Sequence, residues 1–589
     1  MQVVVTAGHV DHGKSTLLRA LTGMEPDRWA EERRRGMTID LGFAWTTLPS
    51  GEVVAFVDGP GPERFVPNML AGAGPAPAAL LVVAADGGWM PQSAEHLAAL
   101  DALGVRHGLL VVTRADLADP SAATAAARAE IARTTLGDLE AVAVSAVTGA
   151  GLDALRDALG RLARRLPPPD TAAPVRLWVD RSFTIRGSGT VVTGTLTAGQ
   201  LHTGDELELA GAGPARVRIR GLQTLGSAAT DVPAVARVAV NLRGVERDQI
   251  RRGDALLSPG HFARTDQLDV RLHGDPVANL PPTVTLHVGS AAVAARVRPL
   301  GPDTARLRLA VALPLRVGDR ALLRDPGRRH VAGGVTVLDV LPPALRRRGA
   351  AAARVEVLST MDGVPDAADE LRRRGLVRRR DLRRMGVSDT SAPVVGDWLV
   401  DPPVWTELRG RLVDAVTGYL RAHPLEPGAP TEALRQALDL PDRALVEALV
   451  QPPLAVRAGR VAPLGTADTL PEPLASAVAR LRGELTDHPF RAPDAGELAA
   501  LGLGPRQIAA AVRAGALLRV ADAVVLLPDA PARARRLLER LPQPFTLSAA
   551  RQALETSRRV AVPLLELLDR QGVTRRLPDD RRTVVGSPP

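Results

Sequence analysis

The chain of 589 residues contains no cysteine, and this absence excludes several kinds of site. Disulfides, cysteine-ligated zinc sites and thiol nucleophiles are all ruled out. A chain without cysteine is typical of a reducing compartment, so we expect a cytoplasmic protein. Long apolar runs are missing too, because none reaches the roughly 20 residues that cross a bilayer. Met1 leads directly into the first expected strand, which predicts no signal peptide and no membrane contact.

Lysine is nearly absent as well: Lys14 is the only one, so 73 of the 74 basic residues are arginine. It lies in Gly8-His9-Val10-Asp11-His12-Gly13-Lys14-Ser15, which has the GxxxxGK[ST] spacing of a phosphate-binding loop. A compact ammonium fits among phosphate oxygens, where a guanidinium fork is too wide. Residues 2–6 read as a buried strand and 16–21 as the start of a helix, which is the context that the motif requires.

This loop is predicted to bind the phosphates of a nucleotide. Lys14 is expected at the β and γ oxygens, and the hydroxyl of Ser15 at Mg²⁺. Backbone N–H groups of the loop are expected to wrap the remaining phosphate oxygens. The full set of predicted phosphate-binding residues is Gly8, His9, Val10, Asp11, His12, Gly13, Lys14, Ser15 and Thr16.

Apolar strands alternate with helical stretches up to about residue 170, which indicates an α/β doubly wound parallel sheet. The expected strands after the loop are 53–57, 79–84, 108–113 and 141–145. Ligands of such sheets gather at the carboxyl ends of the strands. Asp58-Gly59-Pro60-Gly61 follows one strand and would place a carboxylate beside Mg²⁺ and the amide of Gly61 near the γ-phosphate. Thr38, in the polar segment that precedes this strand, could close over the metal. Ser15, Thr38 and Asp58 are therefore the predicted metal ligands.

Two further strand ends carry groups suited to a guanine base. Thr113-Arg114-Ala115-Asp116 ends one strand, and the Asp116 carboxylate can accept from both N1–H and N2–H₂ of guanine. Ser145-Ala146-Val147 ends the next and can supply a backbone amide to the base oxygen. Together with the phosphate loop, these segments resemble the GTP-binding domain of translational GTPases. That resemblance implies GTP and Mg²⁺ as cofactors.

The chain departs from that family at two places. Thr113 and Arg114 occupy the first two positions of the usual Asn-Lys-x-Asp motif. Pro62 stands where translational GTPases usually have the histidine that positions the attacking water. Proline can neither orient water nor move a proton, so we assign no catalytic residue. The expectation is normal GTP binding with slow hydrolysis.

Beyond the prolines at 167–169, short strands punctuated by glycine indicate two β-barrel domains. Residues 186–194 and 237–245 closely resemble the second domain of elongation factors that carry aminoacyl-tRNA. That domain holds the aminoacyl end of the tRNA, and here Asp180, Arg181 and Arg237 are the candidate contacts. A selenol is mostly ionised at pH 7, whereas a cysteine thiol, with a reference pKa of about 8.5, is mostly neutral. The two arginines would therefore favour selenocysteine. The alternative is that Asp180 and an arginine form only a surface ion pair on a barrel strand.

From about residue 350 a pattern of two helices and a hairpin recurs three times, which is the plan of a winged helix. The last copy is strongly basic: residues 531–589 hold 12 arginines and 6 acidic residues. Residues 345–385 have the same counts. A basic tail predicts a polyanionic partner, and the alternative is a solvated face that docks protein. The predicted RNA-binding residues are Ser557, Arg558, Arg559, Arg575 and Arg576.

Over its whole length the chain resembles the bacterial selenocysteine-specific elongation factors. The resemblance implies a monomer whose first three domains carry selenocysteinyl-tRNA to the ribosome and whose tail binds a hairpin in selenoprotein mRNA. Two alternatives remain: a GTPase subunit of sulfate adenylylation, and a GTP-binding regulator that binds nucleic acid with weak or no hydrolysis. The expected fold is multidomain, with a P-loop GTPase domain, two β-barrels and tandem winged helices.

The expected domains are 1–170 for GTP binding, 172–262 and 263–345 for the barrels, a possible first winged helix at 350–425, and winged helices at 426–466, 467–530 and 531–589.

Overall fold

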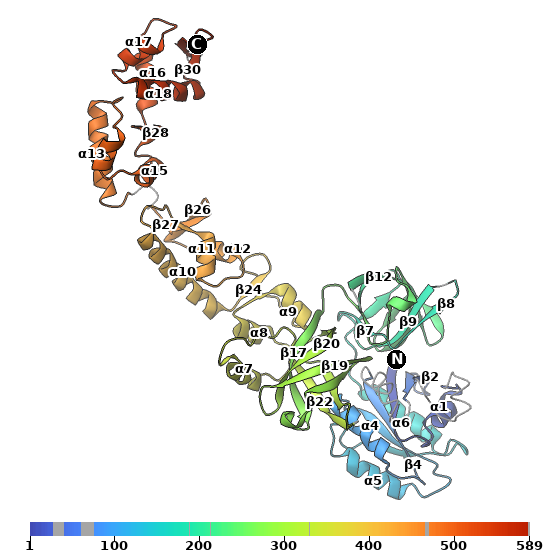
Figure 1. The fold of residues 1–589 in the computed structure, drawn as a ribbon. Coiled ribbons are helices and arrows are strands. Elements are labelled where there is room, and N and C mark those ends of the chain that lie inside the picture. Colours follow the sequence, from blue (N-terminus) through green and yellow to red (C-terminus); the bar gives the residue numbers. More distant parts are fainter. Residues whose placement is uncertain are drawn as a thin grey trace. The chain divides into compact units, whose positions relative to one another are not determined.

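A computed structural model describes residues 1–26, 41–59, 76–187, 189–211, 214–328, 330–465 and 470–586 (Figure 1). The chain divides into two compact units, Met1–Ala392 and Pro393–Pro589. Thr38, Gly61 and Pro62 lie outside the described residues, so their predicted roles stay predictions. Among the described residues, no helix is both long enough and apolar enough to span a membrane.

The first unit begins with the predicted doubly wound sheet. Its strands lie in the order β2-β3-β1-β4-β5-β6, and only β2 runs antiparallel to its neighbour. Helices α1 and α6 cover one face through one apolar cluster, and α4 and α5 cover the other. The bounds are β1 (Gln2–Ala7), α1 (Lys14–Thr22), β2 (Gly42–Thr47), β3 (Val53–Asp58), β4 (Ala78–Ala84), α4 (Pro91–Ala102), β5 (Gly108–Thr113), α5 (Ser121–Ile131), β6 (Ala141–Ala143) and α6 (Leu152–Arg165).

Two antiparallel β domains follow, as expected. The first has the strand order β7-β16-β11-β12-β15-β9-β8 around its own apolar core. The second is a closed barrel in the order β17-β20-β19-β18-β21-β22. The bounds of the first are β7 (Arg176–Trp178), β8 (Arg181–Ile185), β9 (Gly189–Leu196), β11 (Glu206–Ala210), β12 (Pro214–Thr224), β15 (Ala236–Arg243) and β16 (Ala255–Leu257). Those of the second are β17 (Ala263–Gly274), β18 (Thr283–Val288), β19 (Ala291–Pro299), β20 (Thr304–Leu315), β21 (Arg320–Asp325) and β22 (His330–Asp339).

Three short helices, α7 (Ala350–Ser359), α8 (Ala367–Arg374) and α9 (Arg379–Met385), complete the first unit. They are joined to the second barrel by buried ion pairs. Asp269 of β17 accepts from Arg306 at 2.7 and 2.9 Å and from Arg354 of α7 at 2.7 Å. Arg354 and Arg374 also donate to Asp339, at 2.6 and 2.7 Å. These helices therefore belong structurally with the barrel.

The possible first winged helix over residues 350–425 stays a prediction. The boundary between the units falls at residues 392 and 393, within that range. The long helix α10 (Pro402–Ala422) lies in the second unit and packs against α11 (Thr431–Ala437) and α12 (Arg443–Leu449) of the next module.

The second unit contains the three predicted repeats of two helices and a hairpin. Their elements are α11 (Thr431–Ala437), α12 (Arg443–Leu449), β26 (Leu454–Arg457) and β27 (Arg460–Pro463); α14 (Ala495–Ala500), α15 (Pro505–Arg513), β28 (Leu518–Ala521) and β29 (Val524–Leu526); and α17 (Leu547–Ala553), α18 (Arg558–Arg570), β30 (Thr574–Arg576) and β31 (Arg582–Val584). Helices α13 (Leu474–Asp487) and α16 (Ala530–Leu538) precede the last two repeats.

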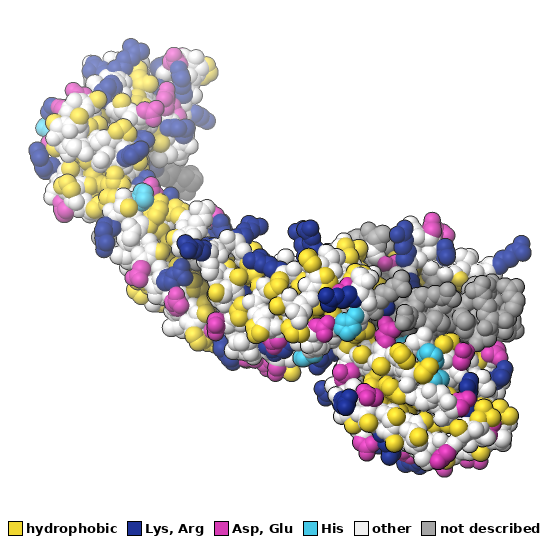
Figure 2. Space-filling view, turned by 60° about the horizontal axis from the view of Figure 1, so that its bottom comes forward, with side chains coloured by type: hydrophobic (Ala, Val, Ile, Leu, Met, Phe, Trp, Pro, Cys, Tyr) yellow, Lys and Arg dark blue, Asp and Glu magenta, His cyan; other side chains and the backbone are white. Residues whose placement is uncertain are grey.

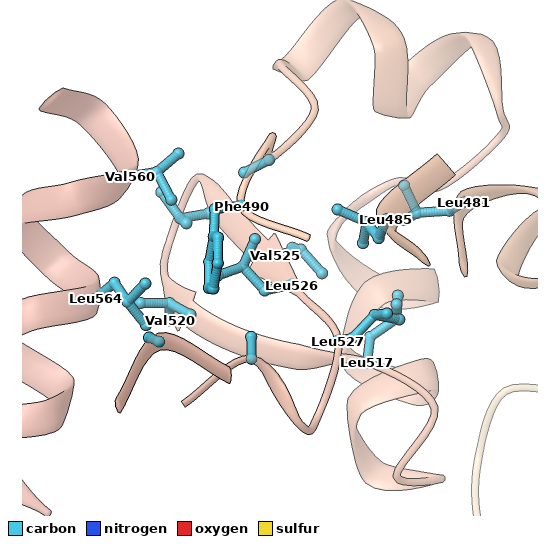
Figure 3. Packing of buried hydrophobic residues seen from close by; sticks show 14 of the residues in the cluster. Leu481, Leu485, Phe490, Leu517, Val520, Val525, Leu526, Leu527, Val560 and Leu564 are labelled. Atoms are coloured by element: carbon cyan, nitrogen blue, oxygen red, sulfur yellow. The ribbon is translucent and has the colours of Figure 1, made fainter. Parts of the chain in front are cut away.

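The last two repeats share one hydrophobic core. Val520 and Leu526 of the β28–β29 hairpin belong to the same cluster as Val560 and Leu564 of α18, and Phe490 lies among them (Figure 3). Burying apolar surface across the junction stabilises both repeats together. We therefore expect residues 470–586 to fold as one body.

Candidate functional site

The predicted phosphate loop joins β1 to α1, and its backbone requires glycine. Gly8 has φ +142°, and a Cβ there would lie 2.2 Å from the carbonyl oxygen of Val82 in β4. Gly13 and Asp11 have left-handed φ values of 77° and 62°. Lys14 folds back over the loop and donates from Nζ to the carbonyl oxygens of Gly8 at 3.1 Å and His9 at 2.8 Å. The loop therefore curls around the lysine, with the N-terminus of α1 facing the space where phosphates would lie.

Oxygen ligands for a metal lie at the start of α1 and at the carboxyl end of β3. Ser15 Oγ donates to Asp58 Oδ2 at 2.8 Å, and Thr6 Oγ1 donates to Asp58 Oδ1 at 2.5 Å. Asp58 is fully buried, and the pairing of Thr6 with Asp58 in the parallel sheet fixes its position. Hydroxyl and carboxylate oxygens are the donors that Mg²⁺ prefers, so these residues fit that ion. Within the described residues no cluster of three acidic or histidine side chains offers an alternative metal site.

The two unusual residues of the base motif tie the end of β5 to the phosphate loop. Thr113 Oγ1 donates to the carbonyl oxygen of His12 at 2.8 Å. Arg114 donates from Nη2 to the carbonyl oxygen of Asp11 and forms an ion pair with Asp86 at 3.0 Å. Both departures from the usual motif therefore keep a structural role: they hold the loop through its carbonyl groups.

The predicted base-reading groups lie at the ends of the neighbouring strands β5 and β6. The amide of Ala115 donates to Val144 at 3.1 Å, which brings the two loops together. The Asp116 carboxylate is exposed, and Val147 is 85% exposed. The amide of Ser145 already donates to Ala150 at 2.9 Å, so an amide for the base must come from Ala146 or Val147.

Sequence reasoning missed two residues of α4 that bind the phosphate loop. His96 Nδ1 accepts the N–H of Gly8 at 3.0 Å, and Gln92 Oε1 accepts the N–H of Val10 at 3.0 Å. Burial, with smaller contributions from Lys14 and His9, lowers the pKa of His96 to about 3. The spacing i, i+4 of two polar residues in an apolar helix was the signal that could have found them.

The structure brings Asp180, Arg181 and Arg237 together at the first barrel. Arg237 forms a two-pronged ion pair with Asp180, one prong of which is Nη2 to Oδ1 at 2.8 Å. Arg181 donates to the carbonyl oxygen of Leu41 at 3.2 Å. Arg181 and Arg237 line a pocket of about 200 Å³. The ring of Phe43 closes it from the GTP-binding domain, with its centroid 3.8 Å from the Arg237 guanidinium carbon.

In the terminal module the predicted RNA-binding residues fall into two groups. Arg558 and Arg576 line a groove of about 580 Å³ between the helices and the wing, and Arg575 is exposed on β30. Ser557 stands at the N-cap of α18, but its side chain makes no capping hydrogen bond. Arg559 donates to the carbonyl oxygens of Ala492 at 2.6 Å and Ala523 at 2.8 Å. These bonds tie its guanidinium to the preceding module, so a structural role is the alternative to its predicted phosphate contact.

Comparison with protein families agrees with this architecture. Residues 1–165 match the elongation factor Tu GTP-binding domain and 189–257 match elongation factor Tu domain 2. Residues 265–344 match the β-barrel domain of selenocysteine-specific elongation factors. Residues 536–583 match a winged helix of elongation factor SelB.

The selenocysteine-specific elongation factor of Escherichia coli K12 is 36% identical over 470 residues, which cover 76% of this chain and 75% of that protein. The chain belongs to this family. The corresponding factor of Desulfomicrobium baculatum is 37% identical over 61% of the chain and 58% of its own length. The crystal structure of bacterial EF-Sec superposes over the full length of both chains with a TM-score of 0.73 and 25% identity.

Membership of the family decides between the readings that the sequence left open. The chain is a selenocysteine-specific translation elongation factor and a translational GTPase. The relatives and family domains do not favour a subunit of sulfate adenylylation or a GTP-binding regulator. The crystal structure of Methanococcus maripaludis SelB in complex with the GTP analogue GppNHp shares the fold over 58% of this chain and 79% of that one, with a TM-score of 0.51 and 24% identity.

Proposed function

We propose that this factor delivers selenocysteinyl-tRNA to the ribosome at UGA codons marked by an mRNA hairpin, which its terminal winged helices bind. It would act as a cytoplasmic monomer. The observation that carries the proposal is the pocket lined by Arg181 and Arg237 of the first barrel. The neighbouring domain in the same unit holds the phosphate loop. A GTP switch and an anion-selective pocket in one unit are what charge-based selection of selenocysteine requires.

In the nucleotide site, residues Gly8 to Thr16 would hold the phosphates and Asp116 the guanine base. Gly61 is expected near the γ-phosphate, and Thr113, Arg114, Ser145, Ala146 and Val147 around the base. Mg²⁺ would be held by Ser15, Asp58 and Thr38 and would neutralise charge on the β and γ oxygens. The bonds of Ser15 and Thr6 to Asp58 support this assignment, because they orient the carboxylate before any ion binds.

In the aminoacyl pocket, Asp180 is engaged with Arg237 and not with Arg181. Thr193 Oγ1 donates to Asp180 Oδ1 at 2.7 Å, so the carboxylate is held from two sides. The charge of Arg237 is thereby largely balanced by Asp180, and Arg181 is the second guanidinium that lines the pocket. An incoming selenolate would add a charge-assisted contact that a seryl hydroxyl cannot make.

Affinities for selenocysteinyl-, cysteinyl- and seryl-tRNA, measured with the GTP-bound protein, test this function. The parent should prefer selenocysteinyl-tRNA. Arg181→Ala should reduce that preference by about tenfold or more, since charge-assisted hydrogen bonds contribute about 1.5–3 kcal/mol. Arg216→Ala, an exposed arginine of the same barrel outside the pocket, is the matched control. Equal losses for all three tRNAs would refute the proposed selection.

A change of base specificity tests the nucleotide site. Asp116→Asn should weaken GTP binding and improve binding of xanthosine triphosphate, because the new amide can donate to the extra carbonyl of xanthine. Unchanged GTP affinity in this variant would remove the end of β5 from the site.

The rate of hydrolysis tests the role of position 62. Pro62→His should accelerate GTP hydrolysis on ribosomes without changing GTP affinity, since positioned groups contribute about 10²–10⁴-fold. A parent that already hydrolyses GTP as fast as the variant would show that another group positions the water.

A further inference from the structure

Helix α4 presents two side chains to the phosphate loop on one face. Gln92 and His96 are four residues apart, so they lie one above the other along the helix. His96 is fully buried, and its Nδ1 accepts the N–H of Gly8. Gln92 is partly buried, and its Oε1 accepts the N–H of Val10. These two bonds fix the first half of the loop against α4.

The same stretch of loop is held from the other side by Lys14. Its Nζ donates to the carbonyl oxygens of Gly8 and His9, so N–H groups and carbonyls of adjacent residues are bound in opposite directions. Gly8 has no room to move toward β4, because Val82 lies against it. A shift of this stretch would therefore also move Lys14, the residue expected at the β and γ oxygens.

Helix α4 is also braced by the second barrel within the same unit. Glu95 forms an ion pair with Arg324 of β21 at 3.3 Å. Leu322 and Val331 of the barrel belong to the same buried cluster as Leu97 and Leu100 of α4. The position of α4 is thus set by packing rather than by the phosphate loop, which makes the helix a fixed support.

We infer that His96 and Gln92 are positioning residues that hold the phosphate loop in its binding conformation and thereby set how slowly GDP and GTP dissociate. The inference rests on the proposed nucleotide site. Neither side chain is among the residues expected to touch the nucleotide. Their effect passes through the backbone of Gly8 and Val10 to Lys14, so it should appear in the dissociation rate and leave base specificity unchanged.

The test compares variants of His96 whose hydrogen-bond acceptors lie at different positions. In His96→Asn the amide oxygen can occupy the position of Nδ1 and keep the bond to Gly8, whereas in His96→Gln it falls near the position of Nε2. Dissociation of a fluorescent GDP from the full chain should be about tenfold faster in His96→Gln, and within about threefold of the parent in His96→Asn, because a lost buried hydrogen bond has an effect of that size. Gln92→Met, which keeps length but removes the acceptor, should also release GDP faster.

Gln552→Met, the same change at an exposed residue of α17, is the matched control and should leave the rate unchanged. Association rates and the preference for GDP over ADP should stay as in the parent. Equal acceleration in His96→Asn and His96→Gln would mean that packing, not the acceptor, matters, and would overturn the inference. Parent-like rates in His96→Gln and Gln92→Met would overturn it too. A parent that binds no GDP would instead refute the nucleotide site itself.

Discussion

Two stretches with the same composition use arginine in different ways. Residues 345–385 and 531–589 each contain 12 arginines and 6 acidic residues. In the first stretch, Arg354 is buried, and Arg354 and Arg374 form ion pairs that join helices to a barrel. In the second stretch, Arg575 is exposed and Arg558 lines an open groove. A charge count therefore says how much charge a segment has, but not how much of it a ligand can reach.

The surface gives the same lesson. On the face shown in Figure 2, basic side chains are dispersed among acidic ones along both units. Within the terminal stretch itself, Arg582 is buried against Asp569 at 2.8 Å, and Arg559 bonds to backbone carbonyls. Buried pairs are costly to break and exposed pairs contribute little, so the two kinds of arginine should respond differently to mutation.

The largest effect is expected at Asp269, which is fully buried and accepts from both Arg306 and Arg354. Asp269→Ala would leave two buried guanidinium groups without their shared carboxylate. Removing one partner of a buried pair costs about 3–5 kcal/mol, so urea unfolding of the first unit should shift strongly. A change below about 1 kcal/mol would show that these arginines are as adaptable as exposed ones.

The next effect is expected in the pH dependence of folding stability, because His96 is buried. The pKa of His96 is lowered by burial to about 3, below the reference of 6.5. Below pH 6.5 the unfolded chain then binds a proton that the folded chain does not, so this contribution to stability is complete above 6.5 and declines toward pH 3. Its slope is at most about 1.4 kcal/mol per pH unit. His96→Asn should flatten that part of the pH profile in urea unfolding, and an unchanged profile would contradict the assignment.

A smaller effect distinguishes the arginines of the terminal module. Replacing Arg558 and Arg575 with alanine should reduce the dependence of mRNA-hairpin binding on log[salt] by a slope of roughly 0.7–0.9 for each lost phosphate contact. Arg559→Ala should leave the salt slope unchanged and instead lower the unfolding temperature of the second unit. A flatter salt slope in Arg559→Ala alone would show that Arg559 contacts RNA phosphates despite its bonds to Ala492 and Ala523.

The smallest effect is expected for an exposed pair. Arg576 and Asp580 are paired four residues apart on the wing, and both side chains are more than half exposed. Asp580→Ala should change stability by less than about 0.5 kcal/mol, because solvent screens such pairs. Freed from its partner, Arg576 should bind RNA slightly more tightly, as titration of the hairpin at low salt would show. A loss of several kcal/mol would erase the distinction between the two stretches.

Much of the nucleotide site was predictable from sequence, because its backbone is determined locally. The GxxxxGK[ST] spacing led to a loop with left-handed Gly13, and Asp58 was expected and found at the end of β3. The roles of Thr113 and Arg114 were not predictable. Their bonds reach carbonyls about 100 residues away in the chain, and only the parallel pairing of strands brings those groups together.

The sequence by itself determined the elements of this protein: the phosphate loop, the alternation of strands and helices, the glycine-punctuated barrels and the repeated helix–helix–hairpin modules. Each follows from local backbone preference and hydrophobic period. Only the tertiary structure decided which charged side chains form internal ion pairs. It also decided that α10 packs within the second unit and that α4 holds the phosphate loop. Those outcomes depend on partners distant in sequence, and no local pattern encodes a partner that folding alone brings within hydrogen-bonding distance.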